Sequence, residues 1–306
     1  MLYNKVVLAA AAATAVNAQR PSDESICDYY TTALLKENTA ENQATLLTLV
    51  VNTVVIGNYT EPNVGIKVPG ILAPGAVDGE EVNLLPYFSG ELATTNRGGS
   101  EGVKVNFLDG GAAEPLKKNM PSDDEESNQY FLLTHLYQFF GSLLGCTMQG
   151  MSGFDAYTAD PSMYEVHKFM NLNLAENTYF IQQVGMAAAS FGVAEEDVTT
   201  VGTALNSLFN VRCAPPATAV KAQGPQLQSI CIDEETCPLA EDANCALYSG
   251  HGGNSTTTPT SSGMPTATGG NGDGGGAEPT AVPTDAAAVH GLGLGALVAA
   301  VAALAL

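Results

Sequence analysis

The sequence of 306 residues contains few basic side chains. Lysine and arginine together number 11 against 32 acidic residues, which gives a formal net charge of −21. A chain this acidic is repelled by anionic polymers, which argues against nucleic acid or bare anionic membrane as a binding partner. A high net charge also keeps a secreted protein soluble, and this is the simpler explanation of the acidity.

Two common kinds of chemical motif are missing as well. The strings GMSGF and FSGEL lack the second glycine of a G-x-S-x-G elbow, so the sequence does not support a serine hydrolase. Five residues separate Cys231 from Cys237 and seven separate Cys237 from Cys245, which is not the spacing of zinc ligands. The sequence therefore carries neither of these two catalytic or metal-binding motifs, and it does not decide whether the protein is an enzyme.

The chain also lacks an apolar run of the roughly 20 residues that a bilayer crossing needs. Its first residues, MLYNKVVLAAAAATAVNAQR, have one early lysine, a short apolar run and small residues before Ala18. This pattern is typical of a secretory signal peptide, and we predict that residues 1–18 are removed.

The other end of the sequence has a matching pattern. Residues 291–306, GLGLGALVAAVAALAL, are uncharged and apolar, and small residues and a polar spacer precede them. Together they predict a GPI-attachment signal that covers 277–306, with the lipid joined between Asp273 and Gly276 or nearer Asp285. A tail that is retained as a membrane anchor is the alternative. Either way we expect an extracellular protein at the cell surface, at the plasma membrane or cell wall.

The secretory pathway is oxidising, so the six cysteines predict three disulfides, with 15 possible pairings. The sequons at Asn58 and Asn254 predict N-glycosylation. Residues 249–276, rich in serine, threonine and glycine, predict a disordered, O-glycosylated stalk. Residues 214–248 form a short cysteine-containing extension, too small for a core of its own.

Residues 25–213 are long enough for one domain, and their apolar pattern is helical. The three-to-four spacing of apolar residues predicts helices over 41–56, 127–146, 176–192 and 194–213, although the valines of the first also allow a strand. Gly145 is a plausible helix stop. A glycine- and proline-rich insertion, 57–121, interrupts an all-α fold with long loop insertions.

Four strings within this domain resemble the truncated (two-over-two) globins. LLPYFSG (84–90) resembles the family's short aromatic turn, and THLYQFFGSLLG (134–145) resembles its distal helix with paired phenylalanines. MYEVHKFMNLNL (163–174) resembles the proximal segment, with a methionine four residues before the histidine. FGVAEEDVTTVGTALNSLF (191–209) resembles the last helix. These strings cover about half of the domain.

The resemblance implies a haem (haem b) with His167 as its proximal iron ligand, because haem iron needs a nitrogen donor and the porphyrin needs dry walls. It implies further that His135 on the distal helix can take the sixth iron site, which favours electron transfer or gated ligand binding. Asn52 or Thr53 stands where the family usually has a tyrosine, which puts tight oxygen stabilisation in doubt. The other residues implied to contact the haem are Phe88, Leu132, Leu136 and Phe140.

Two hypotheses follow. The first is a haem-binding, globin-like surface protein that binds a diatomic gas, passes electrons to a redox partner or holds haem outside the cell. The second is a structural or adhesive GPI-anchored wall glycoprotein that keeps the helical scaffold without haem. The second predicts that side chains fill the slot between the 127–146 helix and the 163–191 region. The sequence does not indicate an oligomeric state.

Overall fold

The computed structural model describes residues 20–60, 63–95 and 101–248. The predicted signal peptide (1–18), stalk (249–276) and GPI-attachment signal (277–306) lie outside the described residues, as does Asn254. Within the described ranges, no helix combines the length and the apolar character needed to cross a membrane.

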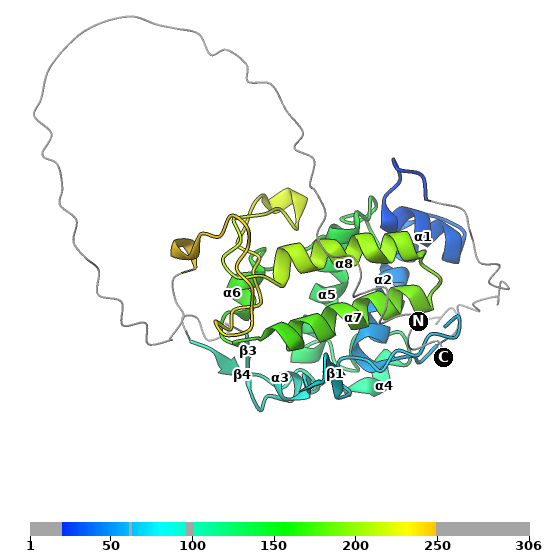
Figure 1. The fold of residues 1–306 in the computed structure, drawn as a ribbon. Coiled ribbons are helices and arrows are strands. Elements are labelled where there is room, and N and C mark those ends of the chain that lie inside the picture. The colour runs from blue at the N-terminus through cyan, green and yellow to red at the C-terminus, as the bar shows by residue number, and fades with distance from the viewer. Residues whose placement is uncertain (1–19, 61–62, 96–100, 249–306) are drawn as a thin grey trace, which may run out of the picture. The chain divides into compact units, whose positions relative to one another are not determined.

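The described residues are mostly helical (Figure 1). The α-helices are α1 (Ile26–Leu35), α2 (Ala40–Ile56), α3 (Leu85–Ser89), α4 (Ala113–Leu116), α5 (Asn128–Leu144), α6 (Met163–His167), α7 (Leu174–Ser190) and α8 (Glu195–Phe209). Two antiparallel hairpins pair β1 (Gly75–Val77) with β2 (Glu80–Val82), and β3 (Ala93–Thr95) with β4 (Val103–Lys104). Two 3₁₀ turns, η1 (Lys221–Gln223) and η2 (Cys245–Leu247), follow.

The four helices expected from the apolar spacing are confirmed, as α2, α5, α7 and α8. Their ends are fixed by local chemistry. The Ser127 hydroxyl caps α5 by accepting a hydrogen bond from the Tyr130 amide, and Gly145 ends that helix in the left-handed region, at φ +78°. Asn173 and Glu176 form a capping box at the start of α7. The strand alternative for residues 41–56 is wrong.

The insertion at 57–121 is more regular than its composition suggested. It carries both hairpins and the short helices α3 and α4. Asp78 and Gly79 turn the first hairpin, both with positive φ (+50° and +88°). An Asp-Gly pair between two short runs is a strong hairpin signal, and it could have predicted this turn from the sequence.

The long helices pack in two pairs that share a core. A short connection joins α7 to α8, and the two helices lie side by side (Figure 1). The second pair is α2 with α5; α2 also packs against α1 and α7, and the β1–β2 hairpin packs against α7. One continuous cluster of buried apolar side chains joins these elements, including Leu47, Val54, Tyr137, Phe140, Val184 and Leu205.

The segment 214–248 lies against the helical body. The Ile230 and Cys231 amides both donate to the Phe209 carbonyl, each at 3.0 Å, and Ala219 and Val220 belong to the main core. All six cysteines are paired, which confirms three disulfides. The pairs are Cys27–Cys146, Cys213–Cys245 and Cys231–Cys237. The first joins α1 to the residue after the α5 cap, the second joins the segment to Cys213 at the end of the helical domain, and the third closes a loop within the segment.

Candidate functional site

His167 is the last residue of α6, a helix of only five residues. The Ser162 hydroxyl starts this helix by accepting a hydrogen bond from the Glu165 amide at 3.2 Å. The His167 Nδ1 atom lies 2.7 Å from the Met163 carbonyl oxygen, one turn back, so Nδ1 carries the proton and donates it. The resemblance implied an imidazole on a helix, and the structure provides only this short one.

The surroundings of His167 keep its ring neutral. Desolvation by burial lowers the pKa of His167 below its ordinary value, and the hydrogen bond to the Met163 carbonyl opposes this shift only in part. The side chain is half-buried, so solvent still reaches part of it. Within the described part of the chain, Nε2 has no hydrogen-bond partner. A neutral imidazole with one nitrogen held by a carbonyl and the other free is the form that binds a metal.

The residues implied to contact haem pack around one core. Phe140 on α5 is buried, with 6% of its surface exposed, and belongs to the main cluster. Phe88 on α3 and the two α5 leucines, Leu132 and Leu136, are half-buried against the same cluster. Val166 and Met170, next to the histidine in sequence, are also half-buried against it. These apolar surfaces are partly accessible, as the edge of an apolar site requires.

His135 lies in the middle of α5 and contacts aromatic rings. Its ring centroid is 4.0 Å from that of Phe131 and 6.1 Å from that of Tyr157, both in edge arrangements. His135 thus contacts the Phe131 and Tyr157 rings, whereas His167 is hydrogen-bonded to the Met163 carbonyl. Ligation of one iron by both histidines stays a prediction.

Asn52 and Thr53, the residues that the resemblance set against a family tyrosine, are both occupied in packing. The Asn52 amide nitrogen donates to the Leu116 carbonyl at 3.1 Å, and its oxygen accepts from the Tyr137 hydroxyl at 2.6 Å. The Thr53 hydroxyl donates to the Leu49 carbonyl within α2 at 2.9 Å. Both side chains are therefore committed to the protein interior.

Aromatic packing also joins α5 to α8. The Phe139 ring lies 5.4 Å from the Tyr157 ring and 6.2 Å from the Phe209 ring, measured between centroids. All three residues are buried. These rings pack directly against one another, so side chains fill the space between Phe139 and the end of α8.

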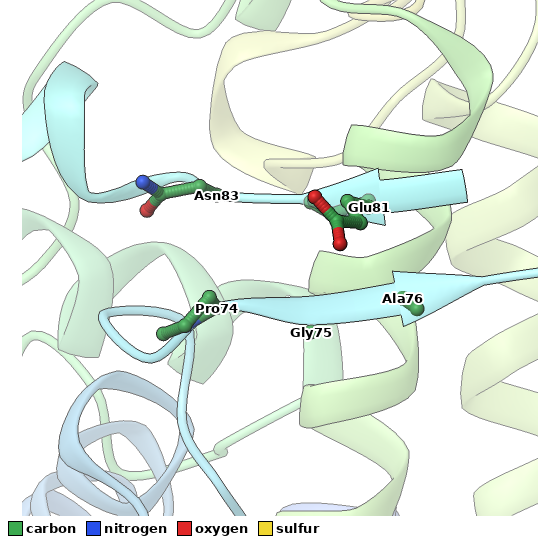
Figure 2. A pocket seen from close by; sticks show the side chains of 6 residues that line it. Pro74, Gly75, Ala76, Glu81 and Asn83 are labelled. Carbon is green, nitrogen blue, oxygen red and sulfur yellow. The ribbon is translucent and has the colours of Figure 1, made fainter. Parts of the chain in front are cut away.

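Two hollows on the surface lie apart from these residues. One of about 520 Å³ is lined by Pro74, Gly75, Ala76, Glu81, Val82 and Asn83 at the β1–β2 hairpin (Figure 2). Glu81 is its one charged side chain, and it gives the hollow no set of converging polar groups. The other, about 140 Å³, is lined by Arg20, Ser22, Ala194, Glu196 and Asp197. No cluster of three or more histidine, cysteine or acidic side chains within the described ranges could hold a bare metal ion.

The dependence of α6 on the C-terminal segment could not be predicted from local sequence patterns. Tyr164 is 1% exposed and forms a small cluster with Cys213, Ile232 and Tyr248. The predicted glycosylation residue Asn58 follows α2 directly and is half-buried. Lys168 forms an ion pair with Glu165 at 2.5 Å.

Comparison of the whole chain with known proteins found no matching family model, no matching curated protein and no matching solved structure.

Proposed function

We propose that this protein binds haem through His167 and presents it outside the cell as a globin-like surface protein. The observation that carries the proposal is the 2.7 Å contact between His167 Nδ1 and the Met163 carbonyl. A backbone carbonyl in this position fixes the tautomer and ring orientation and raises the basicity of the other nitrogen. His167 is therefore prepared to donate Nε2 to iron.

The residues that the resemblance implies around the haem have chemical roles in this proposal. Bound haem would supply an iron centre for diatomic ligand binding or electron transfer. Phe88, Leu132 and Leu136 would exclude water from its faces, since their partly accessible surfaces are apolar. His135 would offer a second nitrogen from α5. We do not assign an enzymatic reaction.

The pairing of the long helices supports the same proposal. A two-over-two arrangement requires one pair from the second and distal helices and another from the last two. α2 packs with α5 and, more extensively, with α7, and α7 packs with α8, so the packing contains both pairs that the proposal requires.

The test is the absorbance spectrum of the purified secreted protein, titrated with haemin. We expect a Soret band that saturates at one haem per chain, and its loss in His167→Ala. His135→Ala is the matched histidine control: it should keep haem and change the ligation state seen in the visible bands. A wild-type protein without a saturable Soret band would exclude the proposal.

A second function is favoured by the packing of Phe139 between Tyr157 and Phe209 and by the disulfides. In this alternative the helical body is a structural or adhesive domain of a GPI-anchored wall glycoprotein. It predicts that haemin leaves the thermal unfolding of the protein unchanged. In both proposals the C-terminal lipid holds the protein at the surface, and release by a phosphatidylinositol-specific phospholipase tests that anchor.

A further inference from the structure

The segment 214–248 holds the start of the histidine-bearing helix. The Ser162 hydroxyl donates to the Leu227 carbonyl at 2.8 Å, and the Tyr164 amide donates to the same oxygen at 3.2 Å. Ser162 is also the N-cap of α6. One carbonyl of the segment therefore fixes both the cap and the first turn of the helix that ends at His167.

Tyr164 is the deepest contact between the two parts. Its hydroxyl donates to the Tyr248 carbonyl at 3.1 Å, and the two rings meet edge to face with centroids 4.7 Å apart. The Tyr248 hydroxyl in turn donates to the Ala214 carbonyl at 2.6 Å. Burial raises the pKa of Tyr164 to about 12, so the hydroxyl keeps its proton and remains a donor at physiological pH.

The segment also holds the chain beyond the histidine. The Ile232 and Asp233 amides both donate to the Leu172 carbonyl, at 3.1 and 3.2 Å. The Leu174 amide donates to the Thr236 hydroxyl at 3.2 Å. These contacts come from the loop that the buried Cys231–Cys237 disulfide closes. His167 thus lies between two fixed points, one on each side in the sequence.

A helix of five residues needs such external support. Helix formation has an unfavourable nucleation step, and isolated helices shorter than about 12 residues are marginal in water. α6 makes few internal hydrogen bonds, so its geometry must come from the groups that hold its ends. The C-terminal segment supplies those groups, and the Cys213–Cys245 disulfide links the chain just before Tyr248 to Cys213, which follows the end of α8.

We propose that residues 214–248 form a strap that positions His167, and that Tyr164 is the positioning residue through which the strap acts. This inference rests on the proposed function for the role of His167, but the strap itself is a property of the haem-free protein. Loss of the strap would leave the imidazole less ordered, so bound haem would dissociate faster.

The test compares Tyr164→Phe with wild type by hydrogen exchange of the haem-free full chain. The variant keeps the ring and removes one hydroxyl, which leaves the buried Tyr248 carbonyl without its donor. We expect the Val166 and Lys168 amides to exchange about tenfold faster, as the loss of one buried hydrogen bond implies. Tyr179→Phe is the matched control, because it removes a buried hydroxyl that donates to the Gly70 and Ala73 carbonyls. It should leave the α6 amides unchanged.

A second variant, Cys213→Ser with Cys245→Ser, opens the strap without changing any residue of α6 and should speed the same amides. The haem readout is the rate at which bound haemin passes to an excess of a haem-accepting apoprotein, expected to rise about tenfold in Tyr164→Phe. Unchanged α6 exchange in both variants would overturn the strap. Faster exchange in a protein that never binds haemin would uphold the strap and overturn the proposed function instead.

Discussion

Tyr137 on α5 donates a hydrogen bond of 2.6 Å to the side-chain oxygen of Asn52 on α2. Asn52 is fully buried, and its nitrogen donates to the Leu116 carbonyl at 3.1 Å. The three residues come from α2, α4 and α5, so this chain of hydrogen bonds ties the end of the insertion to two core helices. Breaking a buried network of this kind costs free energy, because the polar group that loses its partner cannot form a hydrogen bond with water instead.

Removal of the Tyr137 hydroxyl is expected to destabilise the fold. Tyr137→Phe leaves the Asn52 oxygen buried without a donor, and we expect the free energy of unfolding to fall by about 2 kcal/mol. Chemical denaturation of wild type and variant measures this free energy of unfolding. The control is Tyr130→Phe on the same helix: no described residue forms a hydrogen bond with that hydroxyl, so the change should stay below about 0.5 kcal/mol. Equal effects of the two variants would contradict the role of the Asn52 bond.

The disulfides should differ in their contributions to stability. Cys27–Cys146 joins residues 119 positions apart, whereas Cys231–Cys237 spans only 6. Loop-closure entropy predicts a loss of about 5 kcal/mol when the long loop is opened and about 2 kcal/mol for the short one. Paired cysteine-to-serine variants, unfolded by denaturant, test this order. A larger loss from the short loop would show that packing at that site, rather than chain entropy, determines its contribution.

Asp109 is expected to make the stability of α5 depend on pH. Its carboxylate accepts hydrogen bonds from the Gln129 amide at 3.0 Å and the Asn128 amide at 3.1 Å, in the first turn of the helix. Desolvation raises its pKa, but these hydrogen bonds outweigh it and lower the pKa below the ordinary value. The stabilisation is therefore fully present above the unfolded pKa of about 3.9 and is lost as the pH falls from there through the lower pKa of the folded state.

Asp109→Asn should accordingly cost about 0.5 kcal/mol at pH 7, the scale of an exposed charge at a helix N-terminus. The difference from wild type should shrink below pH 4. Denaturant unfolding at both pH values measures it, with Glu125→Gln in the nearby acidic run as the control. A difference that persists unchanged at pH 3 would mean that the charge is not involved.

Asn58 is expected to carry an N-linked glycan in the secreted protein. Its side-chain oxygen accepts a hydrogen bond from the Val68 amide at 2.6 Å, and the residue is half-buried just after α2. The side-chain nitrogen, to which a glycan attaches, forms no hydrogen bond with any described residue. Mass spectrometry after treatment with an amide-cleaving glycosidase should find aspartate at position 58, and Thr60→Ala should prevent this. An unmodified Asn58 peptide from untreated wild type would show that the sequon is unused.

Apolar periodicity predicted the long helices well but did not predict α1. The buried positions of α1 include Asp28 and Thr31, which interrupt an apolar pattern. Asp28 is tolerated because the Gln43 side chain and Thr147 donate to it at 2.6–3.1 Å. Such partners lie 15 and 119 positions away, and no local pattern identifies them.

The sequence predicted which types of residue surround His167, but it did not predict how the segments that carry them are held in place. The string around His167 suggested an imidazole against apolar residues, and the structure places Val166 and Met170 against the core. The brevity of α6 and its dependence on Leu227 and Tyr248 were not predictable, because these contacts join segments more than 60 positions apart. The disulfide pairs could not be predicted either, because the spacing of six cysteines allows 15 pairings.

The Cys213–Cys245 bond determines how the folded body would respond to mechanical force. A pull on the chain beyond Tyr248, such as a tethering surface exerts, reaches Cys245 and crosses directly to Cys213, which follows the end of α8. The 31 residues between them are bypassed and carry no tension. The force would therefore enter the molecule through α8, which packs along α7, and the hydrogen bonds of Leu227 and Asp233 on either side of His167 would stay intact.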